Sequence, residues 1–213
     1  MISPPVTVFV IDDDESVRKS LKRLLDAANY TAEVFKSASE FLSCSPHSGP
    51  SCVIVDVKMP GLSGIDFQEA LIEHGRQEQL IFITAHGDIP MCAQAMKAGA
   101  IDFLPKPFRP DQLLKSVERA LTRSSEHLLR ASERNNARAL LERLTPREYE
   151  VMQLVATGLL NKQVGGELGM AEKTVKTHRA HVMQKLKITS VAELMVILQK
   201  AEITPAVKPG TKV

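Results

Sequence analysis

Short hydrophobic runs alternate with longer amphipathic stretches in the first half of the chain. Five runs of four or five apolar or β-branched residues occupy positions 7–11, 32–35, 52–55, 80–84 and 100–104. Four of the stretches between or after these runs have helical spacing, as where apolar side chains fall at Val17, Leu21, Leu24, Leu25 and Ala28. Continuous hydrophobic runs are typical of parallel strands buried on both faces. The pattern therefore predicts a doubly wound α/β domain of about 120 residues.

Residues 111–144 contain no glycine or proline, and their apolar positions continue a helical spacing as far as Leu128. This spacing predicts a last helix of the α/β domain that runs into a helical linker at residues 123–143. The polar stretch 132–136 includes Asn135 and Asn136, which are poor residues for a helix interior. A mobile, charged tether is therefore an equal alternative for the linker.

The sequence changes character after Leu144. Thr145, Pro146 and Glu148 are typical of the first turn of a helix, and Gly158 follows its last turn. Further helices are predicted at about 161–168, 172–186 and 191–200, so residues 144–203 form an all-α unit of four helices. The tail, residues 204–213, contains two prolines, one glycine and few apolar residues, and it is expected to be disordered.

Composition excludes several classes of protein. The chain has 213 residues, 44% hydrophobic, 24% charged and 4% aromatic, which excludes fibrous, collagenous and disordered proteins. No apolar run approaches the roughly 20 residues that cross a bilayer, and no basic region precedes the first run as in a secretory signal. We expect a cytoplasmic protein without membrane contact. The three cysteines contain no CxxC pair, so they indicate neither a disulfide framework nor a zinc site, and they are predicted to be buried thiols.

The net charge of +2 conceals an uneven distribution. Residues 1–120 contain 12 Lys and Arg against 16 Asp and Glu, and residues 121–213 contain 15 against 9. The first part therefore carries a formal charge of −4 and the second part +6. A basic module joined to an acidic one suggests that nucleic acid is the partner of the basic half, although chance scatter of surface charge gives the same numbers.

Charged and hydroxyl side chains follow four of the five predicted strands. Asp12 and Asp13 come after the first strand, Asp56 after the third, Thr84 ends the fourth, and Lys106 lies just after the fifth. Because the carboxyl ends of parallel strands meet at one edge of a sheet, we expect these side chains to lie together. Three neighbouring carboxylates need a cation to neutralise them. Oxygen ligands without His or Cys favour Mg²⁺, with Mn²⁺ as a substitute.

A carboxylate beside Mg²⁺, with a hydroxyl and an ammonium nearby, is suited to accept a phosphoryl group. Asp56 would be the nucleophile. Lys106 and the metal would offset charge on the phosphoryl oxygens, and Thr84 would donate a hydrogen bond to one of them. Each residue taken alone also has an ordinary structural explanation, because an Asp after a strand often caps a turn and a single Lys is often only solvated.

These residues lie in motifs that resemble the receiver domain of two-component response regulators. The motifs are Val10-Ile11-Asp12-Asp13-Asp14, Asp56-Val57-Lys58-Met59-Pro60-Gly61, Thr84-Ala85 and Lys106-Pro107-Phe108. The resemblance implies a CheY-like five-stranded parallel sheet with strand order 2-1-3-4-5. It also implies a sensor histidine kinase as phosphoryl donor and Asp56 as phosphoacceptor.

The same resemblance assigns roles to the neighbouring residues. It implies Asp12 and Asp13 as acids of the metal site and the backbone carbonyl of Lys58 as a further Mg²⁺ ligand. A cis Lys106–Pro107 bond would direct Lys106 at the phosphoryl group. On phosphorylation Thr84 would move toward the new charge and Phe103 would turn inward, which alters the face made by the fourth helix and the fifth strand and helix. Phe103 lacks the hydroxyl of the tyrosine found there in some relatives.

A second resemblance covers residues 144–197. The segments 158–163, 169–170, 173–179 and 185–187 resemble the LuxR-type helix-turn-helix of NarL-like and FixJ-like regulators. The resemblance implies that Lys176, Thr177 and Ala180 of the recognition helix read bases. The further candidates, for phosphate contacts or groove lining, are Lys162, Lys173, Thr174, His178, Arg179 and Lys185.

Two features depart from this pattern. Ala171 stands where a capping Ser or Thr is common, which forfeits ~1 kcal/mol of helix stability. Gly165 and Gly166 are expected to weaken the short helix by roughly 0.5–1 kcal/mol each.

The combined interpretation is a two-component response regulator rather than an enzyme that turns over an external substrate. Its predicted parts are a receiver at residues 1–122, the helical linker at 123–143, a LuxR-type helix-turn-helix domain at 144–203 and the tail. Phosphorylation of Asp56 is expected to cause homodimerisation and binding to paired half-sites in promoter DNA, which regulates transcription. RNA polymerase is a further candidate partner.

Two alternatives stay open from the sequence. An aspartyl phosphatase or phosphotransferase would use the same Asp and Mg²⁺ chemistry, but Lys58 stands two residues after Asp56, where such enzymes commonly carry a second acid. A phosphorylation-independent DNA-binding protein would use its receiver only for dimerisation.

Overall fold

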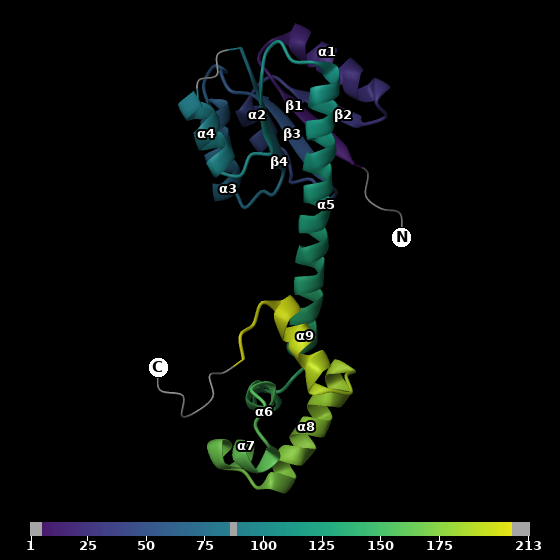
Figure 1. Ribbon diagram of the computed structural model, residues 1–213, viewed down its shortest axis with the longest axis vertical. Coiled ribbons are helices and arrows are strands. Elements are labelled where there is room, and N and C mark those ends of the chain that lie inside the picture. Colours follow the sequence, from purple (N-terminus) through teal and green to yellow (C-terminus); the bar gives the residue numbers. More distant parts are fainter. Residues whose placement is uncertain (1–5, 86–88, 206–213) are drawn as a thin grey trace. The chain divides into compact units, whose positions relative to one another are not determined.

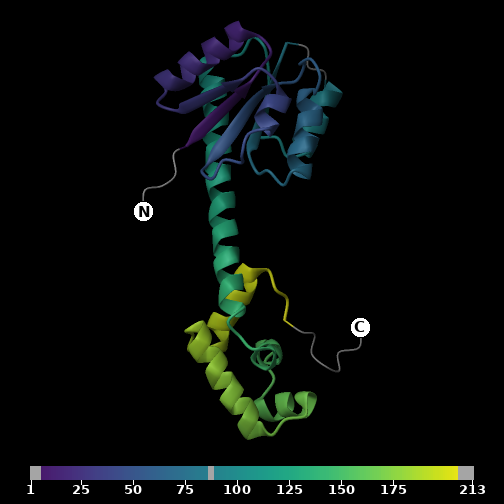
Figure 2. The same ribbon diagram turned by 180° about the vertical axis from the view of Figure 1, so that it is seen from behind.

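The computed structural model describes residues 6–85 and 89–205. The chain forms two compact units, residues 1–128 and residues 129–213, which are described separately below (Figure 1, Figure 2). The predicted disordered tail falls almost entirely at residues 206–213, outside the described part of the chain. Among the residues described, no helix is both long enough and apolar enough to cross a membrane.

The first unit is built on a parallel sheet. Its strands are β1 (Thr7–Ile11), β2 (Thr31–Phe35), β3 (Ser51–Asp56), β4 (Gln79–Thr84) and β5 (Asp102–Pro105). They lie in the order β2-β1-β3-β4-β5, and every neighbouring pair is parallel, so the predicted topology is confirmed. In this register Val10 pairs with both Val34 and Ile54. The strand order places the carboxyl ends of β1 and β3 side by side.

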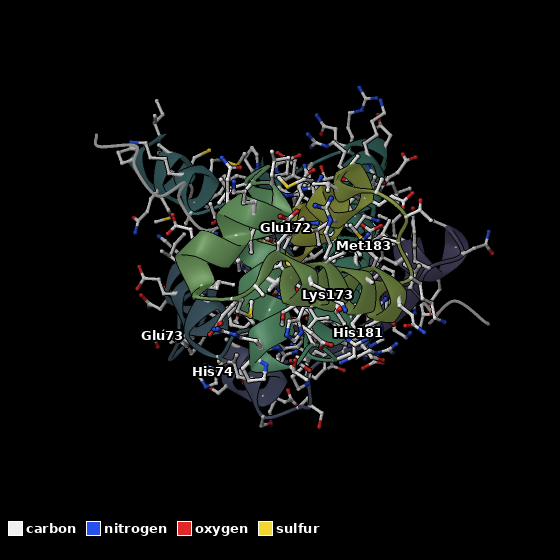
Figure 3. The ribbon with its side chains drawn as sticks, turned by 90° about the horizontal axis from the view of Figure 1, so that it is seen from below. Glu73, His74, Glu172, Lys173, His181 and Met183 are labelled. Atoms are coloured by element: carbon white, nitrogen blue, oxygen red, sulfur yellow. The ribbon has the colours of Figure 1, made fainter. Side chains whose placement is uncertain are left out.

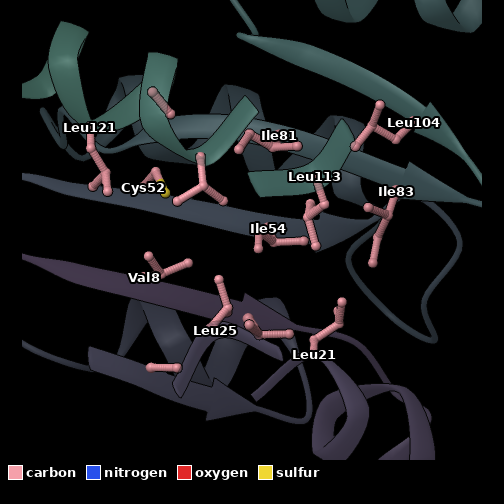
Figure 4. Close-up of a cluster of buried hydrophobic side chains, with 14 residues drawn as sticks. Val8, Leu21, Leu25, Cys52, Ile54, Ile81, Ile83, Leu104, Leu113 and Leu121 are labelled. Carbon is pink, nitrogen blue, oxygen red and sulfur yellow. The ribbon is translucent and has the colours of Figure 1, made fainter. Parts of the chain in front are cut away.

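Helices cover both faces of the sheet. They are α1 (Glu15–Ala27), α2 (Ala38–Leu42), α3 (Gly64–Glu73), α4 (Ile89–Lys97) and α5 (Pro110–Leu141). Successive strand residues alternate between the faces. Val8, Cys52 and Ile81 pack against Leu25 of α1 and Leu113 of α5 (Figure 4). Phe9, Val53 and Phe82 belong to the core on the other face, together with residues of α2, α3 and α4. A helix thus follows each strand, one more than the four predicted.

The second unit consists of helices around one core. Its helices are α6 (Pro146–Ala156), α7 (Asn161–Leu168), α8 (Glu172–Leu186) and α9 (Val191–Ala201), as predicted. Helix α6 begins with a capping box: Glu148 N donates to Thr145 Oγ1 over 3.3 Å, and Thr145 N donates to Glu148 Oε2 over 2.8 Å. The helices bury a common set of apolar side chains, among them Val151, Val175 and Leu194.

The predicted linker is helical, not an irregular tether. Helix α5 continues through Asn135 and Asn136 to Leu141. Ala137 and Leu141 are each only 4% exposed and belong to the core of the second unit. Arg138 Nε also donates to the carbonyl oxygen of Ala201, over 3.1 Å. Tertiary packing of this stretch therefore outweighs the low helix propensity of the two asparagines.

The prediction of three buried thiols was wrong for two of them. Cys52 is buried in the middle of β3, and burial raises the pKa of its thiol. Cys44 is exposed just after the last turn of α2, and Cys92 is half-buried on α4, where Ala95 is the buried residue of the helix. The average burial of cysteine gives no information about where a particular cysteine lies within its element.

Candidate phosphoryl-transfer site and nucleic-acid interface

Three carboxylates meet at the carboxyl edge of the sheet. Asp12, Asp13 and Asp56 each offer an oxygen atom, and the three oxygens lie within 4.8 Å of one another. Asp12 is 1% exposed and Asp56 is 9% exposed, whereas Asp13 faces solvent. Backbone N–H groups hold two of the carboxylates: Asp14 N donates to Asp12 Oδ1 over 2.9 Å, and Lys58 N donates to Asp56 Oδ1 over 3.2 Å. The set contains only oxygen donors and is consistent with a divalent metal site.

Lys106 joins two of these carboxylates. Its Nζ atom lies 2.8 Å from Asp12 Oδ2 and 2.8 Å from Asp56 Oδ2. Burial raises the pKa of Asp12, and the hydrogen bond from Lys106 only partly offsets this. For Lys106, burial acts to lower the pKa, but the two carboxylates outweigh it and raise the pKa above its ordinary value. The ammonium therefore stays charged at the point where negative charge is concentrated.

Local backbone structure directs these side chains. The Lys106–Pro107 peptide is cis, and Lys106 N donates to the carbonyl oxygen of Thr84 over 2.7 Å. Asp14 is the N-cap of α1, with Oδ1 accepting from Ser16 N over 2.7 Å. Arg18 Nη1 donates to the carbonyl oxygen of Asp12 over 2.6 Å. The first turn of α1 thus holds the backbone of the acidic residues that precede it.

Gly64 supports the site and was missed from the sequence. Its N–H donates to the carbonyl oxygen of Val57 over 2.9 Å at the start of α3. A Cβ atom at this position would lie 2.6 Å from the carbonyl oxygen of Asp56 and 2.9 Å from Val57 Cα. Only glycine lets α3 begin so close to the backbone of Asp56. The sequence does offer a signal for this role. Glycine directly follows the N-cap Ser63, at a position where helix propensity does not favour it.

The two predicted switch residues lie on neighbouring strands. Thr84 is fully buried at the end of β4. Phe103 of β5 pairs with Phe82 of β4, and their tilted rings have centroids 6.1 Å apart. Phe103 is half-buried and packs against the core that contains Phe82. It is therefore a core aromatic residue at the rim of the sheet, and the switching roles of Thr84 and Phe103 stay predictions.

In the second unit, α8 has one buried and one exposed face. Val175, Val182 and Leu186 point into the core. The exposed face carries Lys173, Thr174, Lys176, Thr177 and Ala180, and Lys162 is exposed on α7. Figure 3 shows Lys173 at the start of α8 and His181 further along the same helix. Six of the nine predicted DNA-contact residues are thus accessible on adjacent helices.

The other three predicted contacts are half-buried. Arg179 Nη1 donates to Asn161 Oδ1 over 3.2 Å, which links α8 to the first residue of α7. Lys185 Nζ donates to Glu148 Oε2 over 2.6 Å, which links α8 to α6. His178 Nδ1 is buried and, among the described residues, has no hydrogen-bond partner. At least Arg179 and Lys185 therefore have a structural role, which the sequence analysis did not assign.

The two departures noted in the sequence have different outcomes. Ala171 is the N-cap of α8 and makes no side-chain hydrogen bond, as expected. Gly165 is not simply a weak helix residue. A Cβ atom there would lie 2.6 Å from the carbonyl oxygen of Met170, whereas a Cβ on Gly166 would meet nothing within 4 Å. The turn between α7 and α8 folds back onto Gly165, so a side chain would clash there, whereas Gly166 has room for one.

Comparison with known families and proteins agrees with this architecture. The family described as "Response regulator receiver domain" matches residues 8–118, and "Bacterial regulatory proteins, luxR family" matches residues 142–198. Nodulation protein W of Bradyrhizobium diazoefficiens is 47% identical over 195 residues, covering 91% of this chain and 85% of that protein. Transcriptional regulatory protein FixJ of Azorhizobium caulinodans is 37% identical over 199 residues, covering 93% of this chain and 94% of that one.

A solved structure extends the similarity to the fold. The response regulator StyR superposes with a TM-score of 0.81 at 46% sequence identity, covering 92% of this chain and 99% of that chain. FixJ is by name a transcriptional regulatory protein, and the matched families are those of regulators, not of enzymes. The chain therefore belongs to the two-component response regulators that carry a LuxR-type DNA-binding domain and regulate transcription.

Proposed function

We propose that Asp56 accepts a phosphoryl group from a sensor histidine kinase, and that the phosphorylated protein dimerises and binds paired half-sites in promoter DNA. The observation that carries the proposal is the position of Lys106 Nζ, 2.8 Å from both Asp12 and Asp56. A fixed positive charge at this point stabilises the negative charge on the oxygens of a phosphoryl group that is transferred to Asp56.

The residues of the site have complementary roles in this reaction. A carboxylate oxygen of Asp56 attacks the phosphorus atom of the donor phosphohistidine, and the bond from phosphorus to the imidazole nitrogen breaks. Lys106 offsets charge on the phosphoryl oxygens, and the Thr84 hydroxyl donates to one of them. Asp12, Asp13 and Asp56, with the Lys58 carbonyl, would hold Mg²⁺ or its substitute Mn²⁺. When bound, the ion would supply further positive charge beside the same oxygens.

The exposed face of α8 supports the proposed DNA contacts. Lys176, Thr177 and Ala180 lie on it and would face base edges in the major groove. Lys162, Lys173 and Thr174 are equally accessible and would contact phosphates. Arg179 and Lys185 would act near the backbone of the DNA while also holding α8 in place. The half-buried His178 would line the groove.

Phosphoryl uptake tests the first half of the proposal. The full-length protein is incubated with acetyl phosphate and Mg²⁺ and weighed intact by mass spectrometry. We expect one added phosphoryl group in the wild type and in Asp26→Asn, an exposed carboxylate control, and none in Asp56→Asn. Equal uptake by Asp56→Asn would exclude Asp56 as the acceptor. Steady release of phosphate from phosphomonoesters would favour the phosphatase alternative.

DNA selection tests the second half. Genomic fragments are selected in parallel with the phosphorylated wild type and with Asp56→Asn. Enrichment by the phosphorylated protein alone supports the switch and reveals the spacing of the half-sites. Equal enrichment by both proteins would support a regulator that binds DNA independently of phosphorylation.

A further inference from the structure

A second cluster of potential metal ligands lies in the C-terminal unit, far from the acidic residues of the receiver in sequence. Glu148, His178 and His181 each offer one ligand atom, and these atoms all lie within 4.8 Å of one another. The two histidines are three residues apart on α8 and so share one face of the helix. Glu148 comes from the first turn of α6. Packing of α6 against α8 brings the three residues together. The cluster contains no cysteine, so the spacing of the cysteines in the sequence could not reveal it.

Two atoms of this cluster have nearly the spacing of two ligands of one ion. His181 Nδ1 lies 3.7 Å from Glu148 Oε1, which is too long for a hydrogen bond. An ion bound about 2.0–2.1 Å from each of two atoms at a tetrahedral angle holds them about 3.4 Å apart. A small side-chain rotation of His181 is enough to reach that distance. Its side chain is 53% exposed, so it can rotate and an ion can approach from solvent.

His178 supplies an independent observation. Its Nδ1 atom is buried and lacks a hydrogen-bond partner within the described part of the chain. An imidazole with a buried, unsatisfied nitrogen is destabilised relative to one that has a polar partner. Neutral imidazole is also the commonest metal ligand in proteins. Coordination of this ring would give it the partner that the surrounding side chains do not provide.

The two oxygens of Glu148 face different groups. Oε2 accepts from Thr145 N over 2.8 Å and from Lys185 Nζ over 2.6 Å. Oε1 faces His181. The carboxylate can therefore cap α6 with one oxygen and ligate an ion with the other. The Lys185 ammonium opposes this because it repels a second cation held by the same carboxylate.

We propose that Glu148, His178 and His181 bind one divalent transition metal ion of the zinc class, with solvent completing the coordination. Two imidazoles and one carboxylate are a ligand set that suits Zn²⁺ and Co²⁺, whereas the oxygen-only cluster of the receiver suits Mg²⁺. An ion at this position ties α6 to α8, the helix that carries Lys176 and Thr177. It therefore stabilises the folded second unit, by a free energy that grows with the logarithm of the free metal concentration above the Kd.

The test uses cobalt as a visible probe. The full-length protein, with its thiols reduced and Mg²⁺ in excess to fill the acidic cluster, is titrated with Co²⁺ while its visible absorption is recorded. We expect one Co²⁺ per chain with the strong ligand-field absorption of low coordination number. No thiolate-to-cobalt band should appear, because none of the cysteines is a ligand. Added Zn²⁺ should then displace the cobalt.

Variants identify the ligands. His181→Asn should weaken Co²⁺ binding by about tenfold or more, and its circular dichroism should be unchanged because the side chain is largely exposed. His74→Asn, which changes the exposed histidine that follows α3, is the matched control and should bind as the wild type does. Lys185→Met should bind Co²⁺ more tightly, since the competing ammonium is gone. Absent binding in the wild type, unchanged affinity in His181→Asn or a thiolate band would overturn the proposal.

Discussion

The ammonium of Lys185 in α8 lies 2.6 Å from Oε2 of Glu148, which opens α6. Glu148 is 4% exposed, and the same oxygen accepts the backbone N–H of Thr145. Burial alone would raise the pKa of Glu148, but hydrogen bonds from Lys185 and Thr145 lower it to about 2. One carboxylate therefore caps a helix and fixes the helix that carries the proposed DNA contacts.

Because the pKa of Glu148 is lowered in the folded protein, the free energy of unfolding depends on pH in the acidic range. A carboxyl group with a folded pKa of about 2 and an ordinary value of 4.5 stabilises the fold above pH 4.5. That contribution, on the order of 3 kcal/mol, is lost as the pH falls from 4.5 toward 2. Urea unfolding of the wild type and of Glu148→Gln at a series of pH values should show a difference that shrinks in acid. Glu150→Gln, which removes an exposed carboxylate of the same helix, should show almost no such difference.

Two neighbouring glycines of α7 should respond oppositely to alanine. Gly166→Ala adds a methyl group in open space within a helix and should stabilise the protein by about 0.5–1 kcal/mol. Gly165→Ala places its Cβ atom 2.6 Å from the carbonyl oxygen of Met170 and should destabilise it by about 1–3 kcal/mol. Thermal unfolding of both variants measures the difference. Similar effects of the same sign would mean that the turn after α7 adjusts freely.

Removal of the Lys106 ammonium should leave two neighbouring carboxylates without their shared partner. Asp12 is 1% exposed, so Lys106→Met should destabilise the first unit by about 2–3 kcal/mol. Added Mg²⁺ should restore more stability to this variant than to the wild type, because a cation replaces the missing charge. Lys19→Met, which breaks an exposed pair with Glu15, is the control and should cost about 0.5 kcal/mol or less. A Lys106→Met variant as stable as the wild type without Mg²⁺ would contradict the electrostatic role.

Two lysines of α8 should affect DNA binding differently. Lys176 occupies a proposed base-reading position, so Lys176→Ala should weaken binding to the specific site more than binding to unrelated DNA, by about 1–3 kcal/mol. Lys173→Ala removes a proposed phosphate contact and should weaken both about equally, while reducing the salt dependence by about one counterion. Salt titrations of both variants on both DNA sequences make the comparison. If Lys176→Ala lowers the affinity for both DNA sequences equally, Lys176 contacts the DNA phosphates and not the bases.

Much of the fold follows from local patterns. The five hydrophobic runs mark the five strands because parallel strands buried on both faces need apolar residues throughout. Asp12, Asp56 and Lys106 converge because parallel strands share a carboxyl edge. The capping box at Thr145 is likewise a local device. The strands and the cap depend on neighbours in the sequence, and the parallel arrangement of the strands then determines where the site residues meet.

The features that escaped prediction depend on distant contacts. Gly64 and Gly165 are required by the close approach of backbone atoms from other segments. The contact of Lys185 with Glu148 joins residues 37 positions apart and cannot be read from the sequence. Only the positive charge of Lys185 was evident, and that charge suggested a contact with a DNA phosphate. The exposure of Cys44 likewise depends on where α2 ends.

The burial of Ala137 and Leu141 in the core of the second unit affects how this module can be transplanted. A junction drawn at Leu144, where the helix-turn-helix resemblance begins, would remove both side chains and expose the apolar surface they cover. Chimeric regulators that exchange this module with another protein should therefore be joined upstream of Ala137, within the helix itself. A recombination point inside the last turns of α5 would separate the core of the second unit from part of its own packing.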